Sequence, residues 1–254
     1  MKKLARQFCV FAAVGLSLSP AVFAKDPLPP VRPLGNADQN GFLEGVDVPP
    51  VKPARTDETA DPEERSDSPA RACSIPNGVY ETVPAFKGEA DGDPECGVQD
   101  PVKLTGVRGA SGSIKFSMPA LLSCDFAAVL VRWLHEDVLP TSDLRLPSSI
   151  ASLANGPGYQ CRRRNNLPDG KLSEHALGKA IDLSGFMLAD GSLVSVETDW
   201  GSDTIEGRFL KSVHRSACER FTTVLGPDAD DSHKSHMHVD IGCHGKTCTY
   251  LICQ

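Results

Sequence analysis

Two short segments near the C-terminus carry side chains that could together bind a metal ion. Residues 173–182 supply one imidazole and a carboxylate, and residues 233–240 supply further imidazoles. The candidate ligands are His175, Asp182, His236 and His238. In hydrolytic zinc centres three such groups hold the ion, and a fourth position stays open for water. The two segments therefore predict a zinc site of the hydrolytic kind.

The second segment alternates apolar and polar residues as a β-strand does. In a strand over residues 236–241, His236 and His238 lie on the same side, with Cβ atoms about 7 Å apart. Both imidazoles could share one ion, or one could bind the metal while the other faces the substrate; the spacing leaves both open. In the first segment, Asp182 stands between two apolar residues, where a buried carboxylate is costly without a cation.

Composition divides the chain into three regions. Residues 1–24 have a basic start, an apolar run too short to span a bilayer and small residues before a cleavage point, which predicts a secretory signal peptide. Residues 25–72 are rich in proline and acidic residues, which predicts a disordered spacer. Residues 73–254 remain for one folded domain. With no later segment suited to a membrane helix, we expect a periplasmic or secreted monomer.

Charge and cysteine content narrow the function classes. The formal net charge is −7, which disfavours a nucleic-acid partner because phosphate binding needs a basic surface. An even number of cysteines in an exported domain predicts disulfides rather than a metal site, and the sequence does not choose among their pairings. These cysteines are Cys73, Cys96, Cys124, Cys161, Cys218, Cys243, Cys248 and Cys253.

The elements that must position the candidate ligands follow from hydrophobic periodicity. Strands are predicted over residues 102–104, 114–118, 180–186, 192–197 and 236–241. A first helix is predicted from Ser117–Pro119 to about Asp137, and a second from about Glu206 to Leu225, with Cys218 placed to join the second helix to the sheet. The apolar face of the first helix would contain Leu122, Phe126, Leu130, Trp133 and Leu134. Because the predicted strands and helices do not alternate in regular βαβ units, they predict an α+β fold. We expect a small antiparallel sheet that is flanked by helices and stabilised by disulfides.

The motifs resemble those of known families. The pattern Ser-x-His-x-x-Gly-x-Ala-x-Asp, followed far downstream by His-x-His, is similar to that of the LAS group of zinc peptidases, which includes D-Ala-D-Ala carboxypeptidases and murein endopeptidases. Within that group, the chain most resembles the bacterial extensin-like C-terminal domain family, across residues 73–254. Stretches that carry the resemblance include Gly158–Arg162, Leu172–Ala176, Val224–Pro227 and His236–Asp240.

This resemblance implies a LAS metallopeptidase-like fold and a role for each motif residue. His175, Asp182 and His238 match the zinc ligands. His236 matches the histidine that acts as base or stabilises the transition state beside the metal. The carboxypeptidase branch has a glutamate base at the position of Ser235 in this chain, so His236 would have to serve as the base here.

Other polar residues near the metal motif are candidates for substrate binding. An arginine among Arg162, Arg163 and Arg164 could hold a substrate carboxylate through paired hydrogen bonds, although such a run is also typical of a solvated basic surface. Ser173, at the head of the motif, would contact substrate or hold its loop. His233 could contact substrate, support a metal ligand or lie on the surface.

Together these features predict an exported zinc-dependent peptidase that acts on peptidoglycan peptides, as an endopeptidase or a carboxypeptidase. A second hypothesis is a non-catalytic cell-wall-binding or envelope-structural module that retains a metal site. A third is a hydrolase of another small amide or ester. The sequence leaves the cleaved bond open.

Overall fold

The computed structural model of this chain describes residues 72–88, 93–110 and 112–254. All of them lie in one compact unit, Arg65–Gln254. The signal peptide expected over residues 1–24 lies outside the described residues, as does the expected spacer over residues 25–72 apart from its last residue. Within the described part, no helix combines the length and apolar character needed to cross a membrane.

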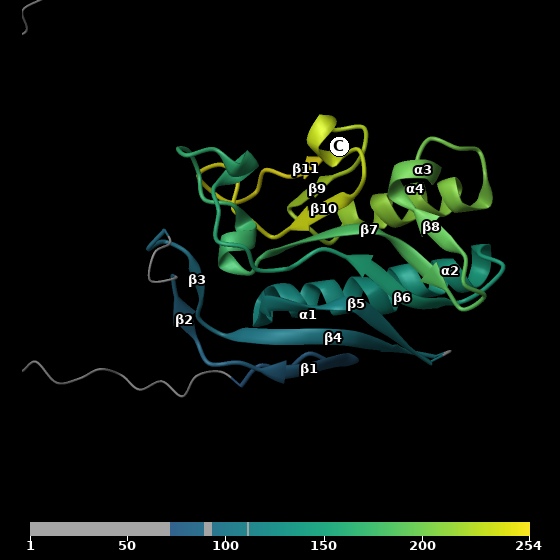
Figure 1. The fold of residues 1–254 in the computed structure, drawn as a ribbon, viewed down its shortest axis with the longest axis horizontal. Helices are drawn as coiled ribbons and strands as arrows, with labels where there is room; N and C mark the ends of the chain where they lie inside the picture. Colours follow the sequence, from purple (N-terminus) through teal and green to yellow (C-terminus); the bar gives the residue numbers. More distant parts are fainter. Residues whose placement is uncertain (1–71, 89–92, 111) are drawn as a thin grey trace, which may run out of the picture. The chain divides into compact units, whose positions relative to one another are not determined.

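A mixed sheet of nine strands forms the framework of the described unit (Figure 1). Its strands are β1 (Gly78–Thr82), β4 (Pro101–Gly109), β5 (Gly112–Ser123), β6 (Ile150–Asn155), β7 (Ala180–Leu188), β8 (Leu193–Ser195), β9 (Thr223–Leu225), β10 (Met237–Asp240) and β11 (Ile252–Cys253). They are ordered β1-β4-β5-β6-β7-β10-β9-β11, and β8 pairs with β7. A second sheet pairs β2 (Phe86–Lys87) with β3 (Gly97–Val98).

The main sheet is larger than the small antiparallel sheet predicted from the sequence, and it is mixed. Most neighbours are antiparallel, but β5 runs parallel to β6, and β9 runs parallel to β11. The connection from β5 to β6 is a helical crossover, which parallel pairing requires. Alternation within a strand identifies its two faces but not its partner, so strand direction was beyond the sequence argument.

Helices fill the connections between strands. The chain passes from β5 into α1 (Cys124–Trp133), through a π-helical turn (Leu134–Val138) and into α2 (Leu139–Arg145). A short α3 (Val196–Asp199) and the longer α4 (Ile205–Cys218) follow β8. Figure 1 shows α1 and α2 running alongside the sheet, and α1 contacts β4 and β5. The predicted α+β class is confirmed.

The predicted start of the first helix was wrong. Residues 117–123 belong to β5, and the helix begins at Cys124. Ser123 is its N-cap, since the Ser123 hydroxyl accepts a hydrogen bond from the Phe126 amide at 3.4 Å. Pro119 fits within the strand because it has no register partner among the described residues of β4, so its missing N–H breaks no ladder bond.

Other boundaries also differ from the prediction. β4 and β5 are longer than predicted, and β10 is shorter, since His236 lies before its first residue. The second helix ends at Cys218 rather than Leu225, because the β-branched stretch that follows it forms β9. The strand predicted over residues 192–197 is shorter, since residues from Val196 onward form α3. There the Asp199 carboxylate accepts a hydrogen bond from the Ser195 amide at 2.8 Å and closes the first turn of that helix.

Disulfides and a continuous apolar core hold these elements together. All eight predicted cysteines are paired, as Cys73–Cys124, Cys96–Cys161, Cys218–Cys253 and Cys243–Cys248. The prediction that Cys218 joins its helix to the sheet is confirmed, because its partner lies in β11. The apolar residues predicted for the first helix are fully buried, namely Leu122, Phe126, Leu130, Trp133 and Leu134, although Leu122 lies in β5.

Candidate metal centre

The pairing of β7 with β10 brings two of the predicted ligands together. These strands are antiparallel, and Asp182 and His238 are direct register partners, so their side chains leave the same face of the sheet. The neighbours of Asp182 in the chain, Ile181 and Leu183, are fully buried on the other face. The polar side chains therefore lie opposite the buried apolar ones, as the alternation of each strand predicted, and the pairing of the two strands brings them together.

A short 3-10 turn, Glu174–Leu177, delivers His175 to the same place. Ser173 caps this turn, because its hydroxyl accepts a hydrogen bond from the His175 amide at 3.4 Å. Gly178 ends the turn with a φ of 65°, and a Cβ there would lie 2.8 Å from the Ser123 nitrogen. A glycine is needed at this position, since a side chain would be both strained and blocked.

The three predicted ligand atoms form a compact triangle. His175 Nε2 lies 3.3 Å from His238 Nδ1 and 3.4 Å from Asp182 Oδ1, and His238 Nδ1 lies 2.9 Å from Asp182 Oδ1. Bonds of about 2.0–2.1 Å to a tetrahedral zinc ion place ligand atoms about 3.3–3.4 Å apart. The two sides that meet at His175 Nε2 match this spacing, and the third side, a hydrogen bond of 2.9 Å between His238 and Asp182, would have to lengthen by about 0.4 Å to hold the ion.

The outer nitrogens of both imidazoles are committed as donors. His175 Nδ1 donates to the Gly158 carbonyl at 2.7 Å, and His238 Nε2 donates to the Asp240 carboxylate at 3.0 Å. When neutral, each ring would therefore point a lone pair toward the centre of the triangle, which is the tautomer that a metal ligand requires. Two nitrogen lone pairs and one carboxylate oxygen make a donor set that suits zinc.

The electrostatics of the triangle favour a positive charge at its centre. Burial opposes ionisation of Asp182, but hydrogen bonds with His175 and His238 outweigh it and hold the pKa of the Asp182 carboxyl far below its usual range. Burial also disfavours a charged His238, yet its hydrogen bonds to Asp182 and Asp240 raise the pKa of His238 to about 9. The centre holds a proton when it holds no cation, and a metal ion would displace that proton.

His236 lies beside the triangle rather than in it. Its Nε2 is 3.7 Å from Asp182 Oδ1, and its side chain is partly exposed. Burial lowers the pKa of His236, which keeps its ring neutral and able to accept a proton. The two histidines of the His-x-His motif thus occupy different places: His238 contributes an atom to the triangle, and His236 does not.

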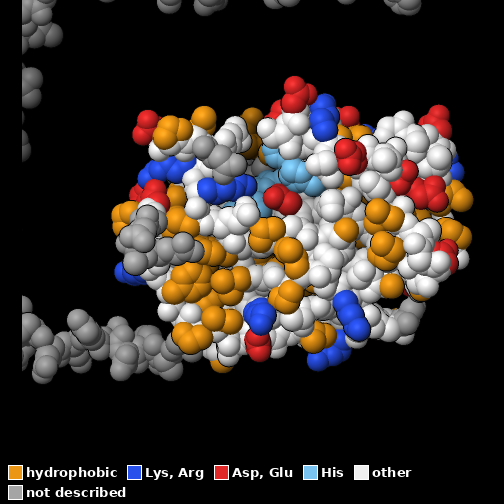
Figure 2. All heavy atoms as spheres, viewed as in Figure 1, with side chains coloured by type: hydrophobic (Ala, Val, Ile, Leu, Met, Phe, Trp, Pro, Cys, Tyr) orange, Lys and Arg blue, Asp and Glu red, His pale blue; other side chains and the backbone are white. Residues whose placement is uncertain are grey.

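His233 stands next to His236 on the outer side. Their ring centroids are 5.3 Å apart, and His233 Nδ1 lies 2.8 Å from the Asp230 carboxylate. The hydrogen bond to His233 is the main cause of a lowered pKa for Asp230. Figure 2 shows histidine side chains gathered in a hollow on this face of the molecule.

A cavity of about 260 Å³ opens beside the candidate centre and is lined by His238 and Asp240. The predicted substrate-binding residues Arg162, Arg164, Ser173 and His233 all line this cavity. Ser173 is only 5% exposed and caps the turn of His175, so of its two predicted roles the structure shows that of holding the loop.

Arg163 points elsewhere than its two neighbours in the arginine run. Its guanidinium pairs with Asp93 and with Glu95, and it does not line the cavity beside His238. Arg164 lies 3.4 Å from Glu174, whereas Arg162 makes no ion pair with any described residue. Of the three arginines, Arg162 has the guanidinium best placed to receive an anion.

The sequence analysis missed the groups that orient the histidine rings of the site. Asp240, the Gly158 carbonyl and Asp230 each fix one imidazole, and none was predicted to do so. Alternation did place Asp240 on the His238 face of its strand, which was an available signal. The Gly158 carbonyl gave no signal, because a backbone acceptor distant in sequence has no residue type to identify it.

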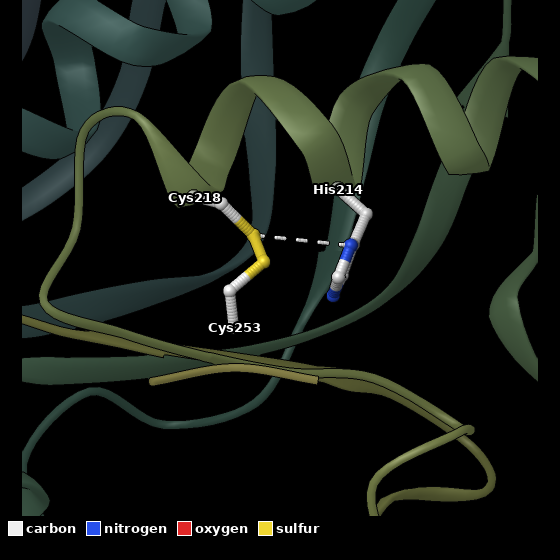
Figure 3. Close-up of side chains that lie close together, drawn as sticks. All are labelled: His214, Cys218 and Cys253. Carbon is white, nitrogen blue, oxygen red and sulfur yellow. Dashed lines mark hydrogen bonds between the residues drawn. A yellow bond between two sulfur atoms is a disulfide. The ribbon is translucent and has the colours of Figure 1, made fainter. Parts of the chain in front are cut away.

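A second group of metal-binding residue types lies at His214, Cys218 and Cys253 (Figure 3). The two sulfurs are joined in a disulfide, and Cys218 Sγ lies 4.0 Å from His214 Nδ1. A sulfur in a disulfide is not a thiolate ligand. The prediction that the cysteines form disulfides rather than a metal site is confirmed for Cys218 and Cys253.

Comparison with known proteins places the chain in a family. Searches of curated proteins and of solved structures returned no match. The family model described as extensin-like protein C-terminus matches residues 72–254, which is more than half of the chain and contains the whole candidate metal centre. The chain belongs to the extensin-like protein C-terminus family.

Proposed function

We propose that this domain is an exported, zinc-dependent peptidase that cleaves peptides of bacterial peptidoglycan. The observation that carries the proposal is the triangle of His175 Nε2, Asp182 Oδ1 and His238 Nδ1, with sides of 3.3, 3.4 and 2.9 Å. Three protein ligands with the fourth position free are typical of catalytic rather than structural zinc. The likeness of the sequence motif to the LAS zinc peptidases supports a peptide substrate.

The residues around the centre suit amide hydrolysis. When bound by His175, Asp182 and His238, zinc would polarise a scissile carbonyl and make a water reactive near neutral pH. His236 would take a proton from the attacking water and return it to the leaving amine. The carboxylate of Asp240 would keep the His238 ring in its binding orientation through the bond from Nε2.

The neighbouring cavity suits a peptide that carries a carboxylate. Arg162 and Arg164 both line it, and a guanidinium can hold a carboxylate through two parallel hydrogen bonds. Three carboxylates line it as well, but each has a partner in the protein: Glu174 pairs with Arg164, and Asp230 and Asp240 bond to histidines, which leaves Arg162 for the substrate. Peptides of bacterial walls carry such groups on their side chains and at their ends. Disulfides support an exported protein, since they persist in oxidising compartments, where a wall hydrolase acts.

Digestion of purified muropeptides, followed by mass spectrometry, tests this proposal and identifies the bond. We expect cleavage by the zinc-loaded chain, and a loss of about 100-fold or more in rate for His236→Ala. His135→Ala is a matched control, because His135 contacts only the Arg108 carbonyl, at 2.9 Å, among the bonds described for it. Zinc binding without cleavage by the wild type would overturn the proposal and favour the non-catalytic wall-binding module.

A further inference from the structure

A cationic stripe runs along the outer face of α4. The inner face of this helix buries Phe209, Leu210, Val213 and Ala217 in the core. Arg208, Lys211 and Arg215 stand at positions i, i+3 and i+7, so they share the opposite, exposed face. The sequence pattern of the helix thus separates an apolar side from a basic one.

This stripe forms one wall of a groove of about 390 Å³. Arg145, at the end of α2, adds a fourth cation, and the loop between α3 and α4 completes the lining. Among the described lining residues, Asp203 is the single carboxylate. We call this the α4 groove, defined by Arg145, Asp203, Arg208, Lys211 and Arg215. It is strongly basic on a chain whose net charge is −7.

Most of the positive charge in the α4 groove is not neutralised within the protein. Arg145, Arg208 and Arg215 make no ion pair with any described residue; Arg208 donates to the Asp203 backbone carbonyl instead. Lys211 is the exception, because it lies 2.6 Å from Asp228 and 3.9 Å from the centre of the Trp200 ring. Three exposed guanidinium groups without a carboxylate partner among the described residues give this surface a positive potential that attracts anions.

Two exposed apolar side chains lie close in sequence to these cations, outside the residues that line the α4 groove. Leu144, which precedes Arg145 in α2, is 87% exposed, and Ile205, at the start of α4, is 44% exposed. Figure 1 shows α2, α3 and α4 together at one end of the described unit. Cations beside exposed aliphatic residues are typical of surfaces that bind the interface of an anionic membrane.

We propose that the α4 groove binds the phosphate head groups of an anionic lipid bilayer, with Leu144 and Ile205 entering the interface. Guanidinium groups suit phosphate because they offer paired donors in a fixed plane. A bilayer accounts for the aliphatic residues, which a small soluble phosphate would leave in water.

The α4 groove is separate from the candidate metal centre. Among the described residues, the groove and the cavity beside His238 share no lining residue. Lipid binding is therefore independent of the proposed peptidase activity, and its test needs no substrate.

Co-sedimentation with lipid vesicles tests the proposal on the chain in its exported form. We expect binding to vesicles of phosphatidylcholine with phosphatidylglycerol and none to phosphatidylcholine alone, and weaker binding as salt is raised. Each cation near an anionic surface contributes about fivefold in affinity, so Arg208→Gln with Arg215→Gln should lose about 25-fold. Arg145→Gln with Arg215→Gln is a second pair, which leaves the start of α4 intact.

Matched variants separate the bilayer from other anions. Arg132→Gln removes an exposed arginine of α1 that lies outside the α4 groove, and it should bind vesicles as the wild type does. Leu144→Ser should weaken vesicle binding. Equal binding to both vesicle types, or an equal loss in Arg132→Gln, would overturn the proposal. So would complete competition by inorganic phosphate together with no effect of Leu144→Ser, since that result indicates a soluble anion.

Discussion

Asp240 acts on the candidate metal centre through His238. Its carboxylate accepts the hydrogen bond from His238 Nε2 at 3.0 Å and so orients the ring whose other nitrogen faces the ion. Asp240→Asn keeps an acceptor but loses the charge, and such changes beside a ligand weaken metal affinity by about 10–100-fold. Chelator-competition titration with zinc measures this loss. Asp190→Asn, at an exposed turn, should leave the affinity unchanged, and an unchanged affinity in Asp240→Asn would contradict this role.

The stability of the metal-free protein should depend on protonation of His238. Burial opposes its charge, but hydrogen bonds to Asp182 and Asp240 raise the pKa of His238 to about 9, above the value of about 6.5 in an unfolded chain. The contribution of protonated His238 to the free energy of unfolding is complete below about pH 6.5. It is lost as the pH rises to about 9, and the whole loss is about 3 kcal/mol.

Urea unfolding of the chelated protein at about pH 6.5 and about pH 9.5 measures this loss. His238→Gln should lack it, because the glutamine amide does not titrate. The affinity for zinc should change in the opposite direction to the stability of the metal-free protein. It should rise with pH, because the proton that competes with the ion leaves His238. The same pH dependence in wild type and His238→Gln would contradict the assignment.

At the residue scale, the sequence predicted the groups with distinctive chemistry and missed those that support them. His175, Asp182 and His238 were predicted as ligands because their motif resembles that of known zinc peptidases, and the structure brings their side chains together. The role of the Gly158 carbonyl depends on a contact between positions 17 residues apart in a loop, which no local pattern encodes. The separation of His236 from the triangle likewise needed the register of β7 and β10.

At the element scale, the start of α1 is the clearest difference from the sequence prediction. A serine stands near both candidate starts, and the structure assigns the cap to Ser123. Ser123→Ala should therefore lower the free energy of unfolding by about 1 kcal/mol. Ser113→Ala, at an exposed position of β5, is the control and should change it little. Urea denaturation measures both, and equal effects would count against a helix that begins at Cys124.

Helices and strands could be predicted where a long stretch of sequence carries a regular pattern of apolar residues. The apolar stripe of α4 and the alternation of β10 gave the correct element and the correct buried face. Residues 219–225 were misassigned, because an apolar run that continues a helical stripe can equally form a buried strand. Tertiary pairing of β9 with β10 and β11 decided between them.

At the scale of the whole molecule, the α+β class and the full pairing of the cysteines followed from composition and element order. The order of the nine strands and the pairing of the cysteines could not be predicted, because most of these contacts join distant segments of the chain. Three of the disulfides join cysteines 35, 51 and 65 residues apart, and Cys243–Cys248 joins cysteines 5 residues apart. The metal centre depends on that long-range order: η3 (Glu174–Leu177), β7 and β10 each contribute one ligand.

Zinc content of the purified chain tests the central claim most directly. After dialysis against zinc, elemental mass spectrometry should find a single ion per chain in the wild type and none in His175→Ala. Asp182→Asn, which preserves side-chain shape, should also lose the ion. His214→Ala belongs to the other group of metal-binding residue types and should retain it. A wild type without zinc, or undiminished zinc in His175→Ala and Asp182→Asn, would contradict the account.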